Sequence, residues 1–192
     1  PTVLEWLEHG VRVRLKRPLR RFHLGVSLLD ATAAQQEFIN QEIQRFVDCG
    51  AWESGVRAHY VSRAFLVPKP GKNKWRFVID LRHLNAHCKD YSMRMETLKR
   101  LRTRGDHMVS FDLQDGFYMV GIHPADRDLF TVELQGRLYR LACLPMGWNA
   151  SPYVFCRVVS VLVRYLRCLQ VDAHRPPQQG VKRRTWERGR IH

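Results

Sequence analysis

The sequence predicts an α+β fold, because two helical segments are separated by several strand-like runs. Apolar residues recur at helical spacing over about 33–49, and strand-like runs flank two turn-forming segments further along the chain. A second helix is expected from about Pro152 to Leu166, since Ser151-Pro152 places proline in a first helical turn. The 192 residues suffice for one large domain or two small ones with a hydrophobic core.

The helix over about 33–49 has recognisable signals at both ends. Thr32 begins a T-x-x-Q capping box, in which two side chains satisfy free backbone N–H groups of the first turn. Gly50 stands where glycine commonly ends a helix, because that position takes a left-handed backbone conformation. The apolar residues between these signals predict a helix that packs against the core.

Two β-hairpins are expected between the helices. The runs VSRAFLV (61–67) and KWRFVID (74–80) are strand-like and flank the turn PKPGKNK. The runs 129–134 and 137–142 flank Gln135-Gly136, which favours a tight hairpin turn.

The stretch between the hairpins is less regular. A short helix is expected after Met95, and HMVSFDL (107–113) predicts a short strand. The following DGFYMV predicts a turn or a short helix.

Both ends of the chain are basic. Residues 1–30 form a basic N-terminal segment, in which VRVRL is either a short edge strand ended by Pro18 or a solvated arm, and we favour the arm. Residues 168–192 are rich in Pro, Gln, Gly and Arg and predict a flexible basic tail. The folded part is therefore expected over 31–167.

The charge balance points to a polyanionic partner. Lys and Arg number 32 against 18 Asp and Glu, which gives a formal net charge of +14 and an isoelectric point near 10.2. Such an excess suits nucleic acid or an anionic membrane surface. No apolar run approaches the ~20 residues needed to span a bilayer. Five cysteines without a C-x-x-C pair indicate reduced thiols in an intracellular protein, of the cytoplasm or the nucleus.

The first segment with candidate chemistry is the basic hairpin. Lys69, Lys72, Lys74 and Arg76 lie on or beside its tip and make a compact positive surface. Lysine offers a point charge and arginine a planar fork, and both suit phosphate oxygens. The alternative is an ordinary solvated turn.

The second segment is SFDLQDGFY, residues 110–118. Asp112 ends a strand-like run, where a carboxylate is able to hold a hard cation such as Mg²⁺ together with substrate phosphates. A helix cap or a surface residue is the alternative, and Asp115 suits a cap of the following turn.

The third segment is LPMGWNASP, residues 144–152. Gly147 and Pro152 restrict the backbone, Trp148 offers a large flat face, and Ser151 suits a helix cap. The segment is either a connection between a hairpin and a helix, or a surface that touches a template base or an incoming nucleotide.

The three segments, VPKPGKNKWRFVIDLRHLN, SFDLQDGFYMVGIHP and LPMGWNASPYVF, together resemble reverse transcriptases. The resemblance covers roughly Val61–Leu166 and is strongest for retrotransposon enzymes of the gypsy or DIRS type. It implies the fingers and an incomplete palm of a right-hand polymerase. It also implies RNA-directed DNA synthesis by two-metal phosphoryl transfer with Mg²⁺ or Mn²⁺. The implied partners are an RNA/DNA template-primer, dNTPs and the thumb and RNase H regions of a polyprotein, rather than a membrane.

The resemblance assigns nucleotide binding to residues of all three segments. These residues are Lys69, Lys72, Lys74, Arg76, Leu113, Asp115, Gly116, Phe117, Met146, Gly147 and Trp148. Asp112 is implied to be the catalytic, metal-binding aspartate, and Leu113 a further metal ligand through its backbone carbonyl. Phe117 matches the bulky residue that leaves no room for a 2′-hydroxyl. Met146 stands where family members often have glutamine.

One expected part of the family pattern is missing. Reverse transcriptases carry a Tyr or Phe, any residue, then Asp-Asp on a hairpin after the helix that begins near Ser151. No Asp-Asp pair occurs in this sequence after Asp115. The sequence therefore predicts a polymerase domain truncated before that hairpin and inactive alone, since one carboxylate of three cannot hold two divalent ions. The alternative is a non-catalytic nucleic-acid-binding module derived from a reverse transcriptase.

Overall fold

The computed structural model describes most of the folded chain. The described residues are 2–23, 28, 30–56, 58, 60–69, 75–93, 113 and 115–173, with the backbone alone for 167 and 169–173. The chain divides into two compact units, Pro1–Arg157 and Val158–His192. The short helix expected after Met95, the strand expected over 107–113 and the tail beyond Ala173 lie outside the described residues.

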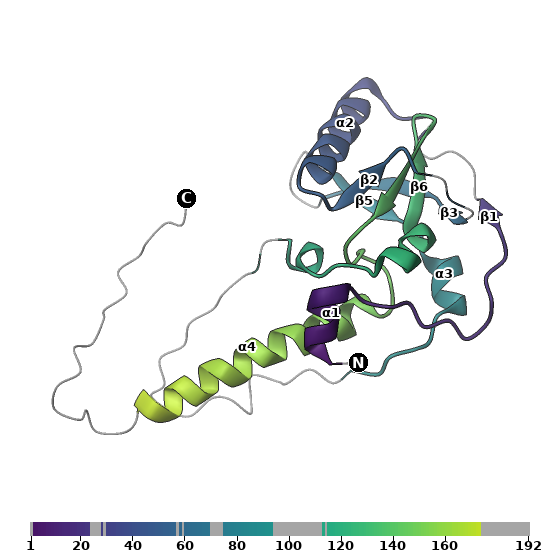
Figure 1. The fold of residues 1–192 in the computed structure, drawn as a ribbon. Helices are drawn as coiled ribbons and strands as arrows, with labels where there is room; N and C mark the ends of the chain where they lie inside the picture. Colours follow the sequence, from purple (N-terminus) through teal and green to yellow (C-terminus); the bar gives the residue numbers. More distant parts are fainter. Residues whose placement is uncertain are drawn as a thin grey trace. The chain divides into compact units, whose positions relative to one another are not determined.

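A five-stranded mixed sheet forms the centre of the first unit (Figure 1). Its strands, in spatial order, are β1 (Phe22–His23), β3 (Tyr60–Ser62), β6 (Thr131–Leu134), β7 (Arg137–Leu141) and β2 (Trp52–Ser54). The pairings β1–β3 and β3–β6 are parallel, and the pairings β6–β7 and β7–β2 are antiparallel. The α+β prediction is therefore confirmed.

Helix α2 (Ala33–Asp48) lies beside β2 and β5 in Figure 1 and supplies part of the core. It begins with the predicted capping box, since the Thr32 N–H donates to Gln35 Oε1 at 2.9 Å and the Gln35 N–H donates back to Thr32 Oγ1. Gly50 follows its end with φ +72°, which confirms the predicted stop. Its buried Phe46 stacks on Trp52 of β2, with ring centroids 4.8 Å apart.

Both predicted hairpins are present. The first, β4 (Ala64–Pro68) with β5 (Trp75–Ile79), is a separate two-stranded sheet. The second, β6 with β7, turns at Gln135 and Gly136, whose positive φ values of 53° and 70° are those of a tight two-residue turn.

The run VSRAFLV differs from its prediction as one strand. Its first part belongs to β3 of the central sheet, and its second part is β4 of the hairpin. The chain changes sheets at Arg63, whose carbonyl oxygen accepts a hydrogen bond from the Asp80 N–H at 2.7 Å. This hydrogen bond continues the pairing of β4 with β5 up to the residue at which the chain leaves the central sheet.

The N-terminal segment is more ordered than the sequence predicts. Helix α1 (Val3–His9) begins with a capping box between Thr2 and Glu5. No strand forms over VRVRL, where Val11 and Leu15 make isolated bridges. The arm is held to the unit by other contacts, including an ion pair in which Arg12 Nε lies 2.6 Å from Asp126 Oδ2.

The remaining helices complete the described structure. They are α3 (Arg82–His87), the 3-10 helices η2 (Gly116–Met119) and η3 (Pro124–Phe130), and α4 (Ser151–Ala173). Helix α4 ends seven residues beyond the predicted Leu166. Within the described ranges, no helix has both the length and the apolar character that crossing a membrane requires.

Candidate nucleotide-binding site

Four of the residues singled out from the sequence line a single cavity of about 710 Å³. They are Lys69 and Arg76 of the basic hairpin, Asp115 beside η2, and Met146 of the loop before α4. The hairpin, α2, η2 and this loop therefore meet around one cavity whose size is typical of small-molecule sites.

On the hairpin side of the cavity, two aromatic rings of β5 pack against the rest of the unit. Trp75 lies against Phe38 of α2, with ring centroids 5.7 Å apart, and Phe77 meets Trp52 edge-on at 5.2 Å. Trp75 and Phe77 precede and follow Arg76 on β5, and Arg76 pairs with Val67 of β4. The side chain of Arg76 is exposed, so its guanidinium is available to an anion at the cavity.

The acidic side of the cavity is already paired with a cation. Asp115 Oδ2 lies 3.0 Å from Arg45 Nη1, and Glu42 Oε2 lies 3.0 Å from Arg45 Nη2. The hydrogen bond to Glu42, with the charges of Glu42 and Asp115, raises the pKa of Arg45 despite its partial burial. The Arg45 guanidinium also lies 4.2 Å from the centre of the Phe46 ring.

Arg45 was not predicted as a site residue. In the sequence it is a polar position in the last turn of an amphipathic helix, which is typical of a solvated face. Its role depends on Asp115, which lies 70 residues further along the chain.

Gly116 and Phe117 lie next to Asp115, but neither lines the cavity. A Cβ atom at Gly116 would lie 2.6 Å from Cζ of Phe155, so a larger residue there would have to displace that ring or the backbone. Phe117 meets Phe155 edge-on, with centroids 5.1 Å apart, and is half-buried. Their predicted contacts with a sugar and a triphosphate remain predictions.

The loop before α4 is held by a side chain that the sequence did not single out. Asn85 Nδ2 donates to the Gly147 carbonyl oxygen at 2.8 Å, and the Asn149 N–H donates to Asn85 Oδ1 at 3.0 Å. Gly147 has φ +97°, a conformation that disfavours other residues. Ser151 Oγ donates to the Pro145 carbonyl oxygen at 2.7 Å. The loop is thus fixed while Met146 stays 53% exposed at the cavity.

Trp148 corrects one expectation from the sequence. Its ring is only 2% exposed and packs edge-on against Phe130, with centroids 5.2 Å apart. The flat face that was expected to touch a base is therefore in the core, where it anchors the loop.

The metal-binding residues are only partly covered by the described structure. Asp112, Lys72 and Lys74 lie outside the described residues, while Leu113 is described and 46% exposed. No group of three or more His, Cys, Asp or Glu side chains suited to a metal ion occurs in the described ranges. The acids that line the cavity, Glu42 and Asp115, are both paired with Arg45. The described residues by themselves therefore do not fit a two-metal centre.

Comparisons with known proteins agree on one family. The family model described as reverse transcriptase (RNA-dependent DNA polymerase) matches residues 67–172. The chain is 28% identical over 136 residues to the retrovirus-related Pol polyprotein from transposon 412 of Drosophila melanogaster, covering 67% of this chain and 11% of that protein. It is 30% identical over 130 residues to the Gag-Pol polyprotein of gibbon ape leukemia virus, covering 62% of this chain and 8% of that protein.

A solved structure shows the same fold. The foamy viral protease-reverse transcriptase in complex with double-stranded DNA superposes with a TM-score of 0.62 at 20% identity, covering 79% of this chain and 28% of that chain. The α+β architecture is therefore that of polymerase fingers with part of a palm. With the family match over more than half of its length, the chain belongs to the reverse transcriptase family.

Proposed function

We propose that this chain is the nucleotide-binding part of an RNA-directed DNA polymerase from a retrotransposon polyprotein. The observation that carries the proposal is the cavity of about 710 Å³ in which Lys69 and Arg76 come together with Asp115 and Met146. These residues belong to all three sequence segments that resemble reverse transcriptases. The ligand of this cavity is an incoming dNTP.

The basic hairpin binds the triphosphate in this proposal. Arg76 offers a planar fork of donors and Lys69 a mobile point charge, and both complement phosphate oxygens. Lys72 and Lys74 belong to the same turn in the sequence and add positive charge. Met146 presents an exposed apolar side chain to the base, where a polar family residue often stands.

The two acidic residues that line the cavity, Glu42 and Asp115, need a neutralising partner. Their carboxylates would repel a triphosphate, and Arg45 on α2 offsets part of this charge by pairing with both. The resemblance to reverse transcriptases assigns the sugar side to Gly116 and Phe117, which adjoin Asp115 outside the cavity lining, with the Phe117 ring excluding a 2′-hydroxyl.

Phosphoryl transfer with two metal ions requires more metal-binding carboxylates than Asp112 alone. Asp112, with the Leu113 carbonyl, is the proposed metal-binding group for Mg²⁺ or Mn²⁺, and no Asp-Asp pair follows it in the 192 residues. Two divalent ions about 4 Å apart repel each other by on the order of 15–20 kcal/mol at an effective dielectric constant of about 20. One aspartate does not offset that repulsion, so we expect the 192 residues alone to lack polymerase activity.

A second function is favoured by the charge of the sequence. A net charge of +14 suits a non-catalytic module that binds nucleic acid. Sequencing the transcript beyond residue 192 separates the two proposals. A strand-like run carrying Asp-Asp supports the polymerase, whereas a stop codon supports the binding module.

Binding and primer extension test the shared part of both proposals. Fluorescence anisotropy with a labelled RNA/DNA template-primer is expected to show binding that weakens steeply as salt rises, because phosphate contacts release counterions. Primer extension by the 192 residues with Mg²⁺ or Mn²⁺ is expected to give no product. Template-dependent synthesis would contradict the proposed inactivity, and a failure to bind the template-primer would contradict both functions.

A further inference from the structure

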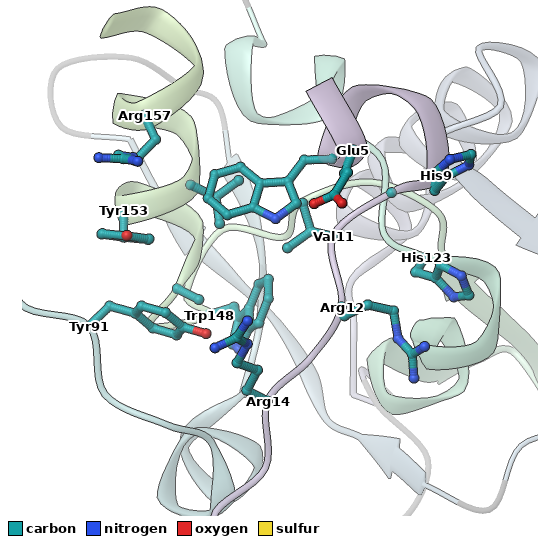
Figure 2. A pocket seen from close by; sticks show the side chains of 14 residues that line it. Glu5, His9, Val11, Arg12, Arg14, Tyr91, His123, Trp148, Tyr153 and Arg157 are labelled. Carbon is teal, nitrogen blue, oxygen red and sulfur yellow. The ribbon is translucent and has the colours of Figure 1, made fainter. Parts of the chain in front are cut away.

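A second cavity, of about 490 Å³, lies between the N-terminal segment, Tyr91 and the first turns of α4, all within the Pro1–Arg157 unit (Figure 2). It shares no lining residue with the candidate nucleotide-binding site. The buried ring of Trp148 forms part of its wall. The proposed function leaves this cavity without a role.

Aromatic rings line one side of this second cavity. Tyr91 and Tyr153 stack with ring centroids 4.8 Å apart, and Trp6 of α1 meets Tyr153 edge-on at 6.4 Å. All three side chains are half-buried, so each ring keeps accessible surface. Partly exposed rings of this kind stack against the planar bases of nucleic acids.

Arginine side chains give the cavity an excess of positive charge. Arg12, Arg14 and Arg157 line it, against a single acidic lining residue, Glu5. Arg12 is held by Asp126, whereas Arg14 is exposed and makes no ion pair with an acidic residue of the described ranges. The lining therefore complements an anionic ligand.

The positive charge of Arg14 lies beside the aromatic rings of the second cavity. Figure 2 shows the guanidinium of Arg14 next to the Tyr91 ring, while Tyr153 and Arg157 project from α4 on the same side of the cavity. Burial raises the pKa of Tyr91 although the nearby Arg14 charge opposes the effect, so the phenol stays neutral and adds no negative charge. A planar group and an attached anion thus have adjacent places to bind.

We propose that this cavity binds one unpaired nucleotide of a single-stranded nucleic acid. The base stacks on the Tyr91–Tyr153 pair, and the phosphate lies at Arg14. A duplex does not fit this description, because its bases are stacked and their faces are covered. The proposal rests on the proposed function for its ligand class, but it depends on different residues.

Cross-linking and binding with short oligo(dT) test the proposal. Oligo(dT) containing 4-thiothymidine is expected to cross-link to peptides carrying Trp6, Tyr91 or Tyr153, as mapped by mass spectrometry. Tyr153→Leu is expected to weaken oligo(dT) binding about tenfold, since loss of one base-stacking ring commonly costs that much. Arg14→Gln is expected to weaken it more than Arg137→Gln, a change of equal charge at an exposed position outside the cavity.

The controls separate this proposal from the proposed function. Duplex template-primer and dTTP binding are expected to stay within about twofold in Tyr153→Leu, because that residue does not line the nucleotide-binding site. Cross-links confined to other peptides, or equal losses in Arg14→Gln and Arg137→Gln, would overturn the cavity proposal while leaving the polymerase proposal intact. Equally tight binding of polyglutamate that depends on Arg14 and not on Tyr153 would also overturn it. Loss of all nucleic-acid binding by the unaltered chain would instead remove both.

Discussion

The side-chain amide of Asn85 holds the Gly147 carbonyl oxygen by a hydrogen bond of 2.8 Å and ties α3 to the loop that carries Met146. The side-chain oxygen Oδ1 of Asn85 also accepts from the Asn149 N–H, so one side chain bridges both sides of Trp148. A loop fixed in this way presents Met146 to the candidate nucleotide-binding site without a cost in ordering at the time of binding. We therefore expect Asn85 to act as a positioning residue.

Replacing Asn85 tests this role. Asn85→Ala is expected to lower the free energy of unfolding by about 1–2 kcal/mol, because two backbone groups lose their partner. It is also expected to weaken dTTP binding through the loosened loop. Urea unfolding and a dTTP titration measure the two effects. Asn40→Ala, which removes an exposed amide bonded to Gln135, is the matched control and is expected to change neither quantity appreciably.

The Gly116–Phe155 contact predicts a coupled pair of substitutions. Gly116→Ala is expected to cost about 1–3 kcal/mol of stability, since its Cβ would lie 2.6 Å from Phe155 Cζ. In the double variant with Phe155→Leu, part of that cost is expected to disappear, so the two effects fall short of adding. Gly121→Ala, whose Cβ would meet Ala142 O at an ordinary 3.7 Å, is the control. Strict additivity in urea unfolding would contradict the predicted clash.

The Arg45–Asp115 ion pair predicts a change in binding rather than in stability. Both side chains are over 40% exposed, so removing the pair is expected to cost less than about 1 kcal/mol of stability. Arg45→Gln leaves the Asp115 charge at the cavity and is expected to weaken dTTP binding about two- to fivefold. Adding Asp115→Asn is expected to restore part of the affinity. A double variant that binds no better than Arg45→Gln alone would show that Asp115 does not repel the triphosphate.

Acid unfolding is expected to depend on Glu53 of β2. Glu53 pairs with Arg127 and with Arg140, whose Nε lies 2.5 Å from Glu53 Oε2. Burial acts to raise the pKa of Glu53, but the Arg140 hydrogen bond and the two arginine charges outweigh it and hold the pKa below the ordinary 4.5.

The sign of the pH effect follows from that lowered pKa. The folded state binds the Glu53 proton less readily than the unfolded chain does, so this stabilisation is fully present above pH 4.5 and is lost as the pH falls through the folded pKa. Urea midpoints measured downward from pH 5.5 are expected to fall more steeply for the unaltered chain than for Glu53→Gln. Parallel profiles would contradict the role of Glu53.

The sequence predicted the helices and hairpins whose signals lie within a few neighbouring residues. Helix α2 follows from Thr32, Gly50 and its apolar spacing, and the β6–β7 hairpin follows from Gln135-Gly136. Helix α1 was missed because it is short and buries no residue, which leaves no periodic apolar signal. The change of sheets at Arg63 depends on pairing with distant strands, which a local pattern does not encode.

One cavity brings together residues that the sequence singled out. Lys69 and Arg76 of the basic hairpin and Met146 of the loop before α4 line it, while their contacts with a nucleotide stay predictions. Asn85 and Arg45 were missed because each acts through a partner at least 62 residues away along the chain.

Binding of dTTP to the chain and to its hairpin variants tests the central claim most directly. Isothermal titration calorimetry would compare the unaltered chain with Arg76→Gln, Lys69→Gln and the control Arg137→Gln, which removes an equal charge outside the site. Loss of a charge-assisted phosphate contact is expected to weaken binding about tenfold or more in Arg76→Gln and Lys69→Gln. The control is expected to stay within about twofold of the unaltered chain, because its charge is remote and screened. Equal affinities for all four proteins, or no dTTP binding at all, would contradict the assignment of this cavity to the incoming nucleotide.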